Sequence, residues 1–303
     1  MTAMSDFLPA PATVNLAGHD VAPIAWGMWR FAGADVSVAR ARIDAAFEAG
    51  VTLFDTADIY GCDTPDGFGS AEALLGRVFA EAPELRDRMI LATKGGIILG
   101  TPYDSSAAYL TSAIDISLKR MNTDHVELWQ IHRPDLLTHP QEIARTLEDA
   151  HKAGKIGAIG VSNFTTAQAA ALAKFLPVPL VSHQSEFSPL HLAPLFDGIF
   201  DQSMERGMAF LAWSTLGGGR LGDPADERTR AVAGLLDAKA AEYGVSRAAA
   251  TYSWVMAHPA RPIPIVGTQN PDRIREIPQA FAPRWTRAEW YAVLQTSMGE
   301  NLP

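Results

Sequence analysis

The chain has 303 residues, of which 48% are apolar and 19% charged, and its net charge at neutral pH is −9. This is a globular composition with enough apolar surface for a sizeable core, and the length fits either one α/β barrel or two smaller domains. The acidic balance argues against binding nucleic acid or an anionic membrane through bulk charge, but it leaves room for a local basic pocket that holds a phosphate.

The single cysteine, Cys62, permits no intrachain disulfide, which suits a reducing compartment. Residues 1–12 lack the basic start and apolar core of a signal peptide. No apolar run approaches the roughly 18 residues that a membrane-spanning helix needs. We therefore expect a cytoplasmic protein with no membrane partner.

Eight short apolar segments recur along the chain. Each is too brief for a helix and too continuously apolar for a strand with one buried face, which is typical of strands buried on both sides. The segments span residues 23–27, 51–55, 89–94, 126–132, 156–163, 180–184, 208–214 and 262–267.

Helical patterns separate these strands, such as the apolar stripe within residues 110–121. Thr138 and Thr165 each precede a glutamine by three residues, the spacing of a capping box, so both are expected to begin helices. Ser70 is a candidate N-cap for the helix after the second strand.

Strand followed by helix, eight times within about 250 residues, is the pattern of a (β/α)8 TIM barrel. A doubly wound open sheet is the alternative, since it also alternates strands and helices. Residues 12–27 predict a β-hairpin that turns at 18–20 and covers the barrel bottom. No linker divides the chain, so we expect a single domain over residues 1–303.

Polar residues end nearly all of the predicted strands. In a barrel the carboxyl ends of the strands lie on one face, which is where chemistry sits. Buried charges are costly unless they are paired, so a carboxylate, an ammonium and an imidazole on three successive strands suggest a functional cluster. From the second strand onward, the strand ends are Asp55, Lys94, His132, Asn163, Gln184, Ser214 and Gly267.

We expect Tyr60 to lie over Asp55, Lys94 and His132 from its loop. A phenol with a pKa near 10 is a poor acid at neutral pH. An adjacent ammonium lowers that pKa, and a carboxylate holds the ammonium in place. With a neutral imidazole to orient a carbonyl, Tyr60 would protonate the oxygen as a hydride reaches the carbon. Each residue taken singly also has an ordinary structural explanation, such as a loop tyrosine on the surface.

Two further stretches predict phosphate contacts. Residues 217–222 match G-x-G-x-x-G, but no apolar helix opens after the last glycine, so a Rossmann fold is not indicated. A glycine loop whose N–H groups approach a pyrophosphate fits better. Residues 268–270 precede Pro271, whose helix start is a second expected phosphate site, and Arg273 follows within the first turns.

Seven motifs stand in order along the chain at the spacing of barrel strands. They are FDTADIYG (54–61), LATKGG (91–96), LWQIHRPD (128–135), GKIGAIGVSNF (154–164), HQSEFSPL (183–190), AWSTLGGGRL (212–221) and IVGTQNPDRIRE (265–276). With them the chain resembles the aldo-keto reductase superfamily, and most of all a bacterial subgroup of oxidoreductases with an AWSxLGGGRL loop.

The resemblance implies a catalytic tetrad of Asp55, Tyr60, Lys94 and His132, with Tyr60 as the general acid. It implies that Trp29, Tyr60 and His132 contact the substrate. The implied activity is reduction of an aldehyde or ketone to an alcohol, or the reverse, with NADP and a small-molecule substrate. A bound metal is not expected.

The resemblance also assigns residues to the cofactor. By this likeness the reaction centre is bordered by Gly27, Met28, Trp29 and Asp55. The nicotinamide carboxamide is held by Ser162, Asn163 and Gln184, and the nicotinamide ring stacks on Trp213. The pyrophosphate lies along Ser214, Leu216, Gly218 and Leu221, and the adenosine end is surrounded by Gly267, Thr268, Gln269, Arg273 and Glu276.

Three positions depart from the family pattern. Gly267 stands where many members carry a lysine that contacts the 2′-phosphate, but Arg273 is retained, so NADP is favoured and NAD stays possible. Ile277 replaces the second residue of a Glu-Asn pair. Arg133 stands where an aromatic residue is often found, so substrate contacts there do not transfer.

Two other functions remain as alternatives. One is a cofactor-binding regulatory subunit with little or no turnover. The other is a metal-dependent barrel hydrolase, which needs several histidine and carboxylate ligands at strand ends. The substrate pocket is expected to be built from the loops 61–69, 97–107 and 186–200 and from the C-terminal segment, with an aromatic lining that favours a hydrophobic or cyclic carbonyl compound.

Overall fold

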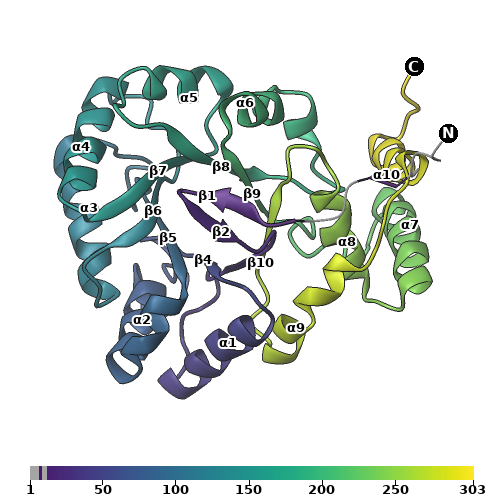
Figure 1. Cartoon of the computed structure of the whole chain (residues 1–303), viewed down its shortest axis with the longest axis horizontal. Helices are drawn as coiled ribbons and strands as arrows, with labels where there is room; N and C mark the ends of the chain where they lie inside the picture. Colours follow the sequence, from purple (N-terminus) through teal and green to yellow (C-terminus); the bar gives the residue numbers. More distant parts are fainter. Residues whose placement is uncertain (1–6, 9–11) are drawn as a thin grey trace.

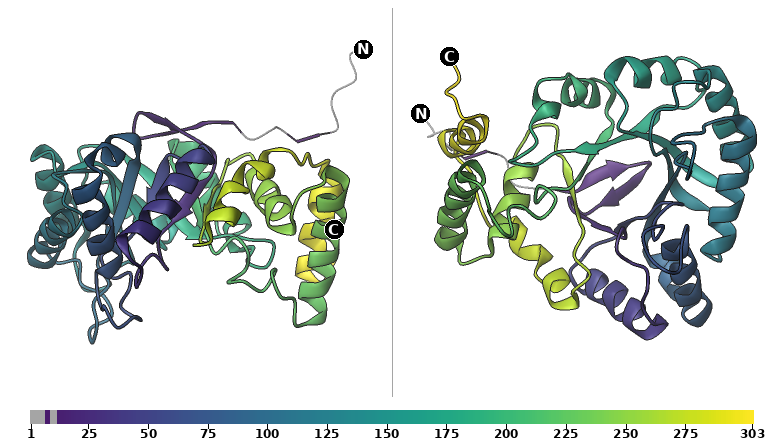
Figure 2. Two further views of the ribbon diagram at one scale, coloured as in Figure 1. Left: turned by 90° about the horizontal axis from the view of Figure 1, so that it is seen from below. Right: turned by 180° about the vertical axis from the view of Figure 1, so that it is seen from behind.

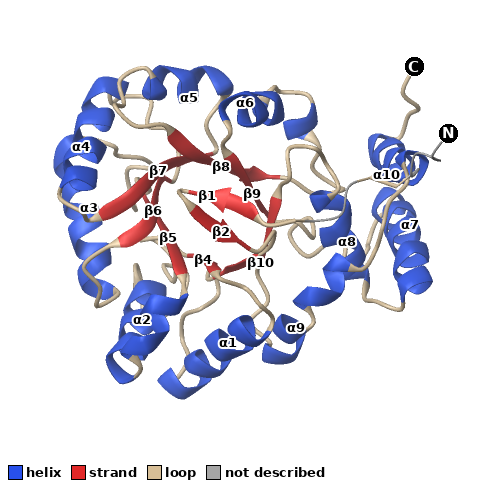
Figure 3. Cartoon of the chain, in the orientation of Figure 1, coloured by secondary structure: helices blue, strands red, loops and turns tan. Residues whose placement is uncertain are grey.

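Eight parallel strands close into a barrel in the computed structural model, which describes residues 7–8 and 12–303. Each strand pairs with its neighbours along the chain, and the ring closes where β10 pairs with β3 (Figures 1 and 3). The strands are β3 (Ala25–Gly27), β4 (Leu53–Asp55), β5 (Ile90–Gly95), β6 (Val126–Ile131), β7 (Ile156–Ser162), β8 (Leu180–Glu186), β9 (Ala209–Trp213) and β10 (Ile263–Val266).

Helices surround this ring and cover its outer face (Figure 3). All eight predicted strands are present, and helical segments follow them as the alternating pattern predicts. The helices are α1 (Val36–Glu48), α2 (Ser70–Glu81), α3 (Ala107–Arg120), α4 (Pro140–Lys152), α5 (Thr166–Ala173), α6 (Ile199–Arg206), α7 (Glu227–Tyr243), α8 (Arg247–Met256), α9 (Pro271–Arg275) and α10 (Arg287–Met298), with 3-10 turns η1 (Pro83–Arg88), η2 (Ala193–Leu195) and η3 (Ile277–Phe281).

The two predicted capping boxes behave differently. Thr165 caps α5, and Gln168 completes the reciprocal hydrogen bonds of the box. Thr138 does not cap α4, because its hydroxyl donates to the Asp135 carboxylate instead. His139 takes the N-cap position, where its ring nitrogen accepts a hydrogen bond from the backbone N–H two residues on.

The predicted N-cap of α2 is also wrong by one residue. Gly69 is the N-cap, with a left-handed φ of +82°, and Ser70 is the first helical residue. A side chain at Gly69 would collide with the guanidinium of Arg120, so the position requires glycine on two counts. This close approach fixes the loop that carries Tyr60 against α3.

A β-hairpin closes one end of the barrel, as predicted. β1 (Val14–Leu16) and β2 (His19–Val21) pair antiparallel and turn at residues 17–18, one residue earlier than expected. Leu16 and Val21 are fully buried in a cluster with residues from the first halves of the barrel strands. The hairpin lies across the centre of the barrel in Figure 1 and at one end of it in Figure 2.

The C-terminal helix packs outside the ring, beside α7 (Figures 1 and 2). The rings of Trp254 and Trp290 stack with centroids 4.8 Å apart, and each indole N–H donates to the other residue's carbonyl. Two buried indoles thereby satisfy each other's polar groups while joining α10 to α8. None of the described helices is long and apolar enough to cross a membrane. Most of residues 1–12, where no signal peptide is expected, lies outside the described residues.

Candidate active site

A buried ion pair lies at the carboxyl ends of β4 and β5. The Lys94 ammonium is 2.6 Å from the Asp55 carboxylate and donates a second hydrogen bond, of 2.7 Å, to the Thr56 carbonyl. Both charged side chains are buried. Burial is the largest single effect and disfavours the ammonium, but Asp55 and Tyr60 together outweigh it and raise the pKa of Lys94 above its ordinary value. A charged lysine is therefore held inside the barrel.

The second oxygen of Asp55 is held by two amides. Gln184 donates to it at 2.9 Å and Gln130 at 3.4 Å. Ser182 in turn donates to the Gln130 carbonyl oxygen. Gln130 was missed in the sequence, although an amide inside the otherwise apolar end of β6 was a visible signal. These bonds leave the carboxylate fully engaged, as a buried charge requires.

Tyr60 lies over the ion pair on the loop that links β4 to α2. Its carbonyl accepts a hydrogen bond from the Ala71 N–H, which ties the loop to the start of α2. The Lys94 ammonium lies 4.9 Å from the centre of the Tyr60 ring. Edge-to-face contacts join that ring to Trp29 at 5.0 Å and to His132 at 5.9 Å. The four residues of the predicted tetrad therefore come together.

The expected pKa of Tyr60 is wrong in its net direction. Burial raises the pKa of the phenol above its ordinary value of 10.0, and the Lys94 ammonium offsets only part of that rise. The lysine acts with the predicted sign, but removal of the ring from water is the larger effect. Tyr60 is consequently a neutral phenol at pH 7 that carries its proton.

His132 follows the last residue of β6 and faces the same space. Its backbone N–H donates to the Gly95 carbonyl, which extends the β5–β6 pairing by one residue. Burial, with smaller effects of Lys94 and Arg133, lowers the pKa of the imidazole well below its usual range. The ring is therefore neutral at pH 7, and its Nδ1 has no partner among the described residues.

A second buried acid cluster lies beneath the Tyr60 loop. Asp58 accepts a hydrogen bond from the Tyr109 hydroxyl, and Glu72 accepts one from Thr93 and faces Arg120. Burial raises the pKa of Asp58 well above its usual range, and the neighbouring Glu72 raises it further. An acid that holds its proton more tightly than usual thus lies two residues before Tyr60. This cluster was not predicted from the sequence.

A cavity of about 740 Å³ opens beside the tetrad and reaches the ends of β9 and β10. Most residues assigned to the cofactor line it. The lining members are Gly27, Trp29, Asp55, Ser162, Asn163, Gln184, Trp213, Ser214, Leu216, Gly218, Gly267, Thr268, Gln269 and Arg273.

Three assigned residues lie away from this cavity. Met28 is fully buried in the core beneath the β3 end, and Leu221 turns into the apolar cluster that contains Phe187. Glu276 caps the C-terminus of α9 and is exposed. Assignment along a motif does not tell which side chains of a loop point inward, which is why these positions differ. The lining residues that the sequence analysis did not assign are Arg30, Arg133, Thr215, Gly219, Gly222, Tyr252 and Ile265.

Asn163 organises one end of the cavity. Its amide nitrogen donates to the His132 carbonyl and to the Ser162 hydroxyl, and its amide oxygen accepts from the Trp213 indole N–H. Asn163 has a φ of +59°, and Ser214, after β9, has a φ of +56°. Two non-glycine residues in the left-handed region line one cavity, and strained backbone of this kind concentrates at functional sites.

The glycine loop after β9 presents unused backbone donors. Gly217, Gly218 and Gly219 all have left-handed φ angles, between +61° and +94°. The N–H groups of residues 215, 216 and 218 donate to no acceptor within the described part of the chain. Consecutive free N–H groups in such a turn form a concave site for an anion.

The start of α9 differs from the prediction of a phosphate site. The Asn270 side chain accepts hydrogen bonds from the N–H groups of Asp272 and Arg273, so the helix start is already capped. The Arg273 side chain is exposed and lines the cavity. It makes no ion pair with any residue that the structure describes.

The loops expected to build the substrate pocket do not line the cavity. Residues 61–69, 97–107 and 186–200 and the C-terminal segment contribute no lining residue. Phe187 is fully buried against Trp254, and the 97–107 loop closes on itself through a bridge between Ile97 and Tyr103. The Phe187 ring serves packing, whereas Tyr103 and Phe196 are exposed. The expectation about the loops is therefore wrong. The cavity is nevertheless partly aromatic, as expected, with Trp29, Tyr60, Trp213 and Tyr252 in its lining, and it also carries three arginines.

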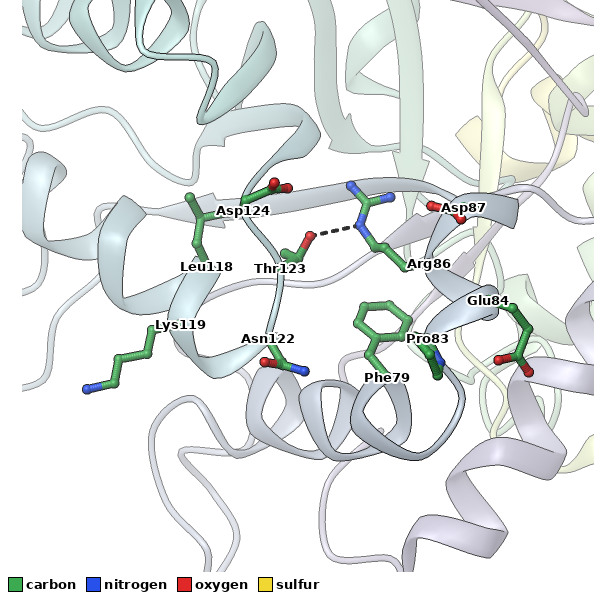
Figure 4. A pocket seen from close by; sticks show the side chains of 10 residues that line it. All are labelled: Phe79, Pro83, Glu84, Arg86, Asp87, Leu118, Lys119, Asn122, Thr123 and Asp124. Atoms are coloured by element: carbon green, nitrogen blue, oxygen red, sulfur yellow. Dashed lines mark hydrogen bonds between the residues drawn. The ribbon is translucent and has the colours of Figure 1, made fainter.

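A second depression, of about 780 Å³, lies between α2, η1 and the end of α3 (Figure 4). Its arginine, Arg86, donates to Thr123, as Figure 4 shows, and both oxygens of Glu127 accept from it. These contacts occupy the Arg86 guanidinium. Among residues 7–8 and 12–303, no group of three or more His, Cys, Asp and Glu side chains is arranged to hold a metal ion.

Comparison with known proteins extends these findings. The aldo/keto reductase family model matches residues 23–295. A 6-dehydroglucose reductase of Novosphingobium aromaticivorans is 54% identical over 99% of this chain and all of that protein. A protein of the same name from Agrobacterium fabrum is 35% identical over 93% of this chain and 96% of its own length.

A solved structure shares the fold. The glycerol dehydrogenase of Gluconobacter oxydans superposes with a TM-score of 0.82 at 24% sequence identity, over 99% of this chain and 98% of that one. The named relatives are reductases, which gives no support to the alternative of a regulatory subunit. The chain is an oxidoreductase of bacterial type, and it belongs to the aldo/keto reductase family.

Proposed function

We propose that this enzyme uses NADPH to reduce an aldehyde or ketone to an alcohol, or catalyses the reverse reaction, with Tyr60 as the proton donor. The observation that carries the proposal is a neutral phenol that shares one cavity with a neutral imidazole and lies over a buried ion pair. The phenol holds a proton to give, and the Lys94 ammonium stabilises the anion that remains.

Each proposed role follows from a contact of this chain. His132 is neutral, so it can donate a hydrogen bond to the carbonyl oxygen without competing as an acid. When bound, the cofactor would supply a hydride to the carbonyl carbon. Tyr60 then gives its proton to the oxygen as the C=O double bond becomes a single bond. Asp55 keeps Lys94 charged, and water returns a proton to Tyr60 afterwards.

The lining of the cavity supports a nicotinamide dinucleotide. Gln184 uses its amide nitrogen on Asp55 and retains its oxygen as an acceptor for a carboxamide. The free N–H groups at 215, 216 and 218 suit a pyrophosphate. Trp213 offers a ring face at the nicotinamide end. The residues that would hold the cofactor are thus supplied by β7, β8, β9 and the loop after β9.

The β10 end of the cavity favours NADPH over NADH. Arg273 offers an unpaired guanidinium for a 2′-phosphate, whereas an enzyme selective for NADH commonly presents a carboxylate to the 2′-hydroxyl. Among the lining residues that the structure describes, Asp55 is the one carboxylate, and it is occupied by Lys94. Thr268 and Gln269 complete this end of the cavity, while Glu276 does not reach it.

We further infer that the substrate is a polyhydroxylated, sugar-derived aldehyde. Two relatives carry the name 6-dehydroglucose reductase, and one of them matches 99% of this chain. The arginines and hydroxyl groups of the lining, beside Trp29 and Tyr252, offer hydrogen-bond partners to such a compound.

The test is consumption of NADPH or NADH by the purified enzyme with a panel of sugar aldehydes, simple aldehydes and ketones. We expect saturable turnover with sugar aldehydes and a kcat/KM at least about 10-fold higher with NADPH, a difference that the single Arg273–phosphate contact can supply. An enzyme that binds NADPH but reduces no carbonyl compound would contradict the proposal.

A further inference from the structure

The cavity has a charge opposite to that of the whole chain. The protein carries a net charge of −9, yet three of the cavity-lining residues are arginines, namely Arg30, Arg133 and Arg273. Within the described lining, the one carboxylate is already neutralised by Lys94. An excess of cationic groups in a cleft attracts anionic ligands.

Arg133 lines the cavity beside the proposed chemistry. It follows His132 directly in the chain, is half-buried, and lies with its guanidinium carbon 5.9 Å from the centre of the Trp213 ring. It makes no hydrogen bond or ion pair with any residue that the structure describes. Arg86 offers a contrast, because that guanidinium is saturated by Glu127, Thr123 and the His125 carbonyl. A guanidinium that folding leaves free inside a cleft is available to a ligand.

Arg133 and Arg273 serve different groups. Arg133 follows β6 and Arg273 follows β10, and these two strands are four positions apart in a ring of eight. The two arginines therefore lie across the rim from one another. The cofactor phosphates are assigned to Arg273 after β10 and to the free N–H groups at 215, 216 and 218 after β9, so Arg133 is not needed by either. Its position beside His132 puts it next to the reacting carbonyl.

We propose that Arg133 binds an oxyanion group of the substrate, so that the enzyme prefers hydroxy-aldehydes that carry a phosphate or a carboxylate. A guanidinium presents a planar fork that matches either group with two parallel hydrogen bonds. The proposal rests on the proposed function, because it assigns one end of the same substrate. It makes Arg133 a specificity-determining residue, separate from the tetrad.

The experiment measures kcat/KM for two matched pairs of aldehydes. The first pair is glyceraldehyde 3-phosphate and glyceraldehyde, and the second is glucuronate and glucose. We expect the wild type to favour the anionic member of at least one pair by about 10-fold or more. The pair with the larger ratio identifies phosphate or carboxylate as the group that Arg133 binds.

Arg133→Gln should lower that ratio by about 10-fold or more, to a value near one, chiefly through a higher KM for the anionic aldehyde. Arg133→Lys should retain part of the preference, since it keeps the charge and loses the fork. Arg145→Gln, which removes an exposed arginine of α4 without a partner in the described chain, is the matched control and should keep the wild-type ratio.

Three results would overturn the inference. The first is a wild type with equal kcat/KM for the anionic and neutral members of both pairs. The second is an Arg133→Gln variant whose kcat/KM falls by the same factor for neutral and anionic aldehydes. The third is a variant whose NADPH affinity falls as much as its kcat/KM for the anionic aldehyde, which would make Arg133 a cofactor ligand. If the wild type reduces none of the four aldehydes, the proposed function fails. Calorimetric titration with inorganic phosphate then tests the subsite alone, and equal affinity for wild type and Arg133→Gln refutes it.

Discussion

The two ends of the barrel are built from the same strands and are used in opposite ways. At the amino end, Leu16 and Val21 of the hairpin pack onto the first residues of the strands in a fully apolar cluster. At the carboxyl end, two residues further along β4 and β5, the interior holds the Asp55–Lys94 pair and opens into the cavity. Two residues along the same strand thus separate the apolar packing layer from the proposed catalytic groups.

This difference shows how the fold keeps a buried charge. The hairpin and the apolar layer supply stability that does not depend on the polar end. The polar end can then hold groups that are poor for stability, such as a desolvated ammonium and a neutral phenol. Substitutions at the amino end should therefore change the free energy of unfolding without changing turnover. Substitutions at the carboxyl end should change turnover without changing the free energy of unfolding, unless they leave a buried charge without its partner.

The largest effect is expected from Lys94→Met. It leaves the Asp55 carboxylate buried without its partner, so we expect a loss of about 3–5 kcal/mol in the free energy of unfolding, together with loss of turnover. Urea denaturation and NADPH consumption measure the two effects. The double variant Asp55→Asn/Lys94→Met removes both charges and should recover most of the stability but none of the turnover. Recovery of turnover in the double variant would contradict the proposed role of Lys94.

Leu16→Ala should have the second-largest effect, and it should change stability without changing turnover. The side chain is fully buried in the hairpin, and its truncation should lower the free energy of unfolding by about 2–5 kcal/mol. We expect kcat/KM to stay within about twofold at a temperature where the variant is folded. Val38→Ala, at a half-exposed position of α1, is the control and should change neither quantity. A large fall in kcat for folded Leu16→Ala would mean that the two ends are coupled.

Asp58→Asn should have a smaller effect that depends on pH. Because burial raises the pKa of Asp58, the folded state holds this proton more tightly than the unfolded state. The associated stability is present at low pH and is lost as the pH rises through the folded-state pKa. An amide has no proton to lose, so the variant should gain stability relative to the wild type between pH 5 and pH 8, by about 1 kcal/mol. The difference in urea midpoint between variant and wild type is measured at pH 5 and at pH 8. A difference that is less favourable to the variant at pH 8 than at pH 5 would contradict this prediction.

The smallest expected effect is that of pH on reduction by the wild type. Tyr60 keeps its proton because its pKa is raised, and His132 stays neutral because its pKa is lowered. The kcat/KM for carbonyl reduction should therefore be flat between about pH 7 and pH 9. A pH profile with NADPH saturating checks this. A fall in that range that disappears in Tyr60→Phe would indicate a lower phenol pKa.

Much of the barrel and its tetrad was predictable from the sequence. Continuous apolar runs mark strands buried on both faces, and the polar residues that end them meet because parallel strands end together. Asp55, Lys94 and His132 needed only strand order to be placed side by side. The hairpin also followed from local turn residues, with an error of one residue in its position.

The remaining errors concern properties that depend on the folded environment. The net pKa of Tyr60 depends on how completely its loop, Trp29 and α2 exclude water, and no local pattern contains that. The Thr138 hydroxyl donates a hydrogen bond to the Asp135 carboxylate and does not cap the start of α4. Leu221 lies in the assigned motif, yet it turns into the core. In each case a tertiary contact outweighed a local preference.

Turnover by Tyr60→Phe tests the central claim most directly, because this change removes one hydroxyl and keeps the ring that contacts Trp29 and His132. The claim is that the Tyr60 proton reaches the carbonyl oxygen. We expect kcat for reduction to fall by about 10²- to 10⁴-fold while the dissociation constant for NADPH, measured by fluorescence titration, stays close to that of the wild type. A kcat equal to that of the wild type would contradict the account.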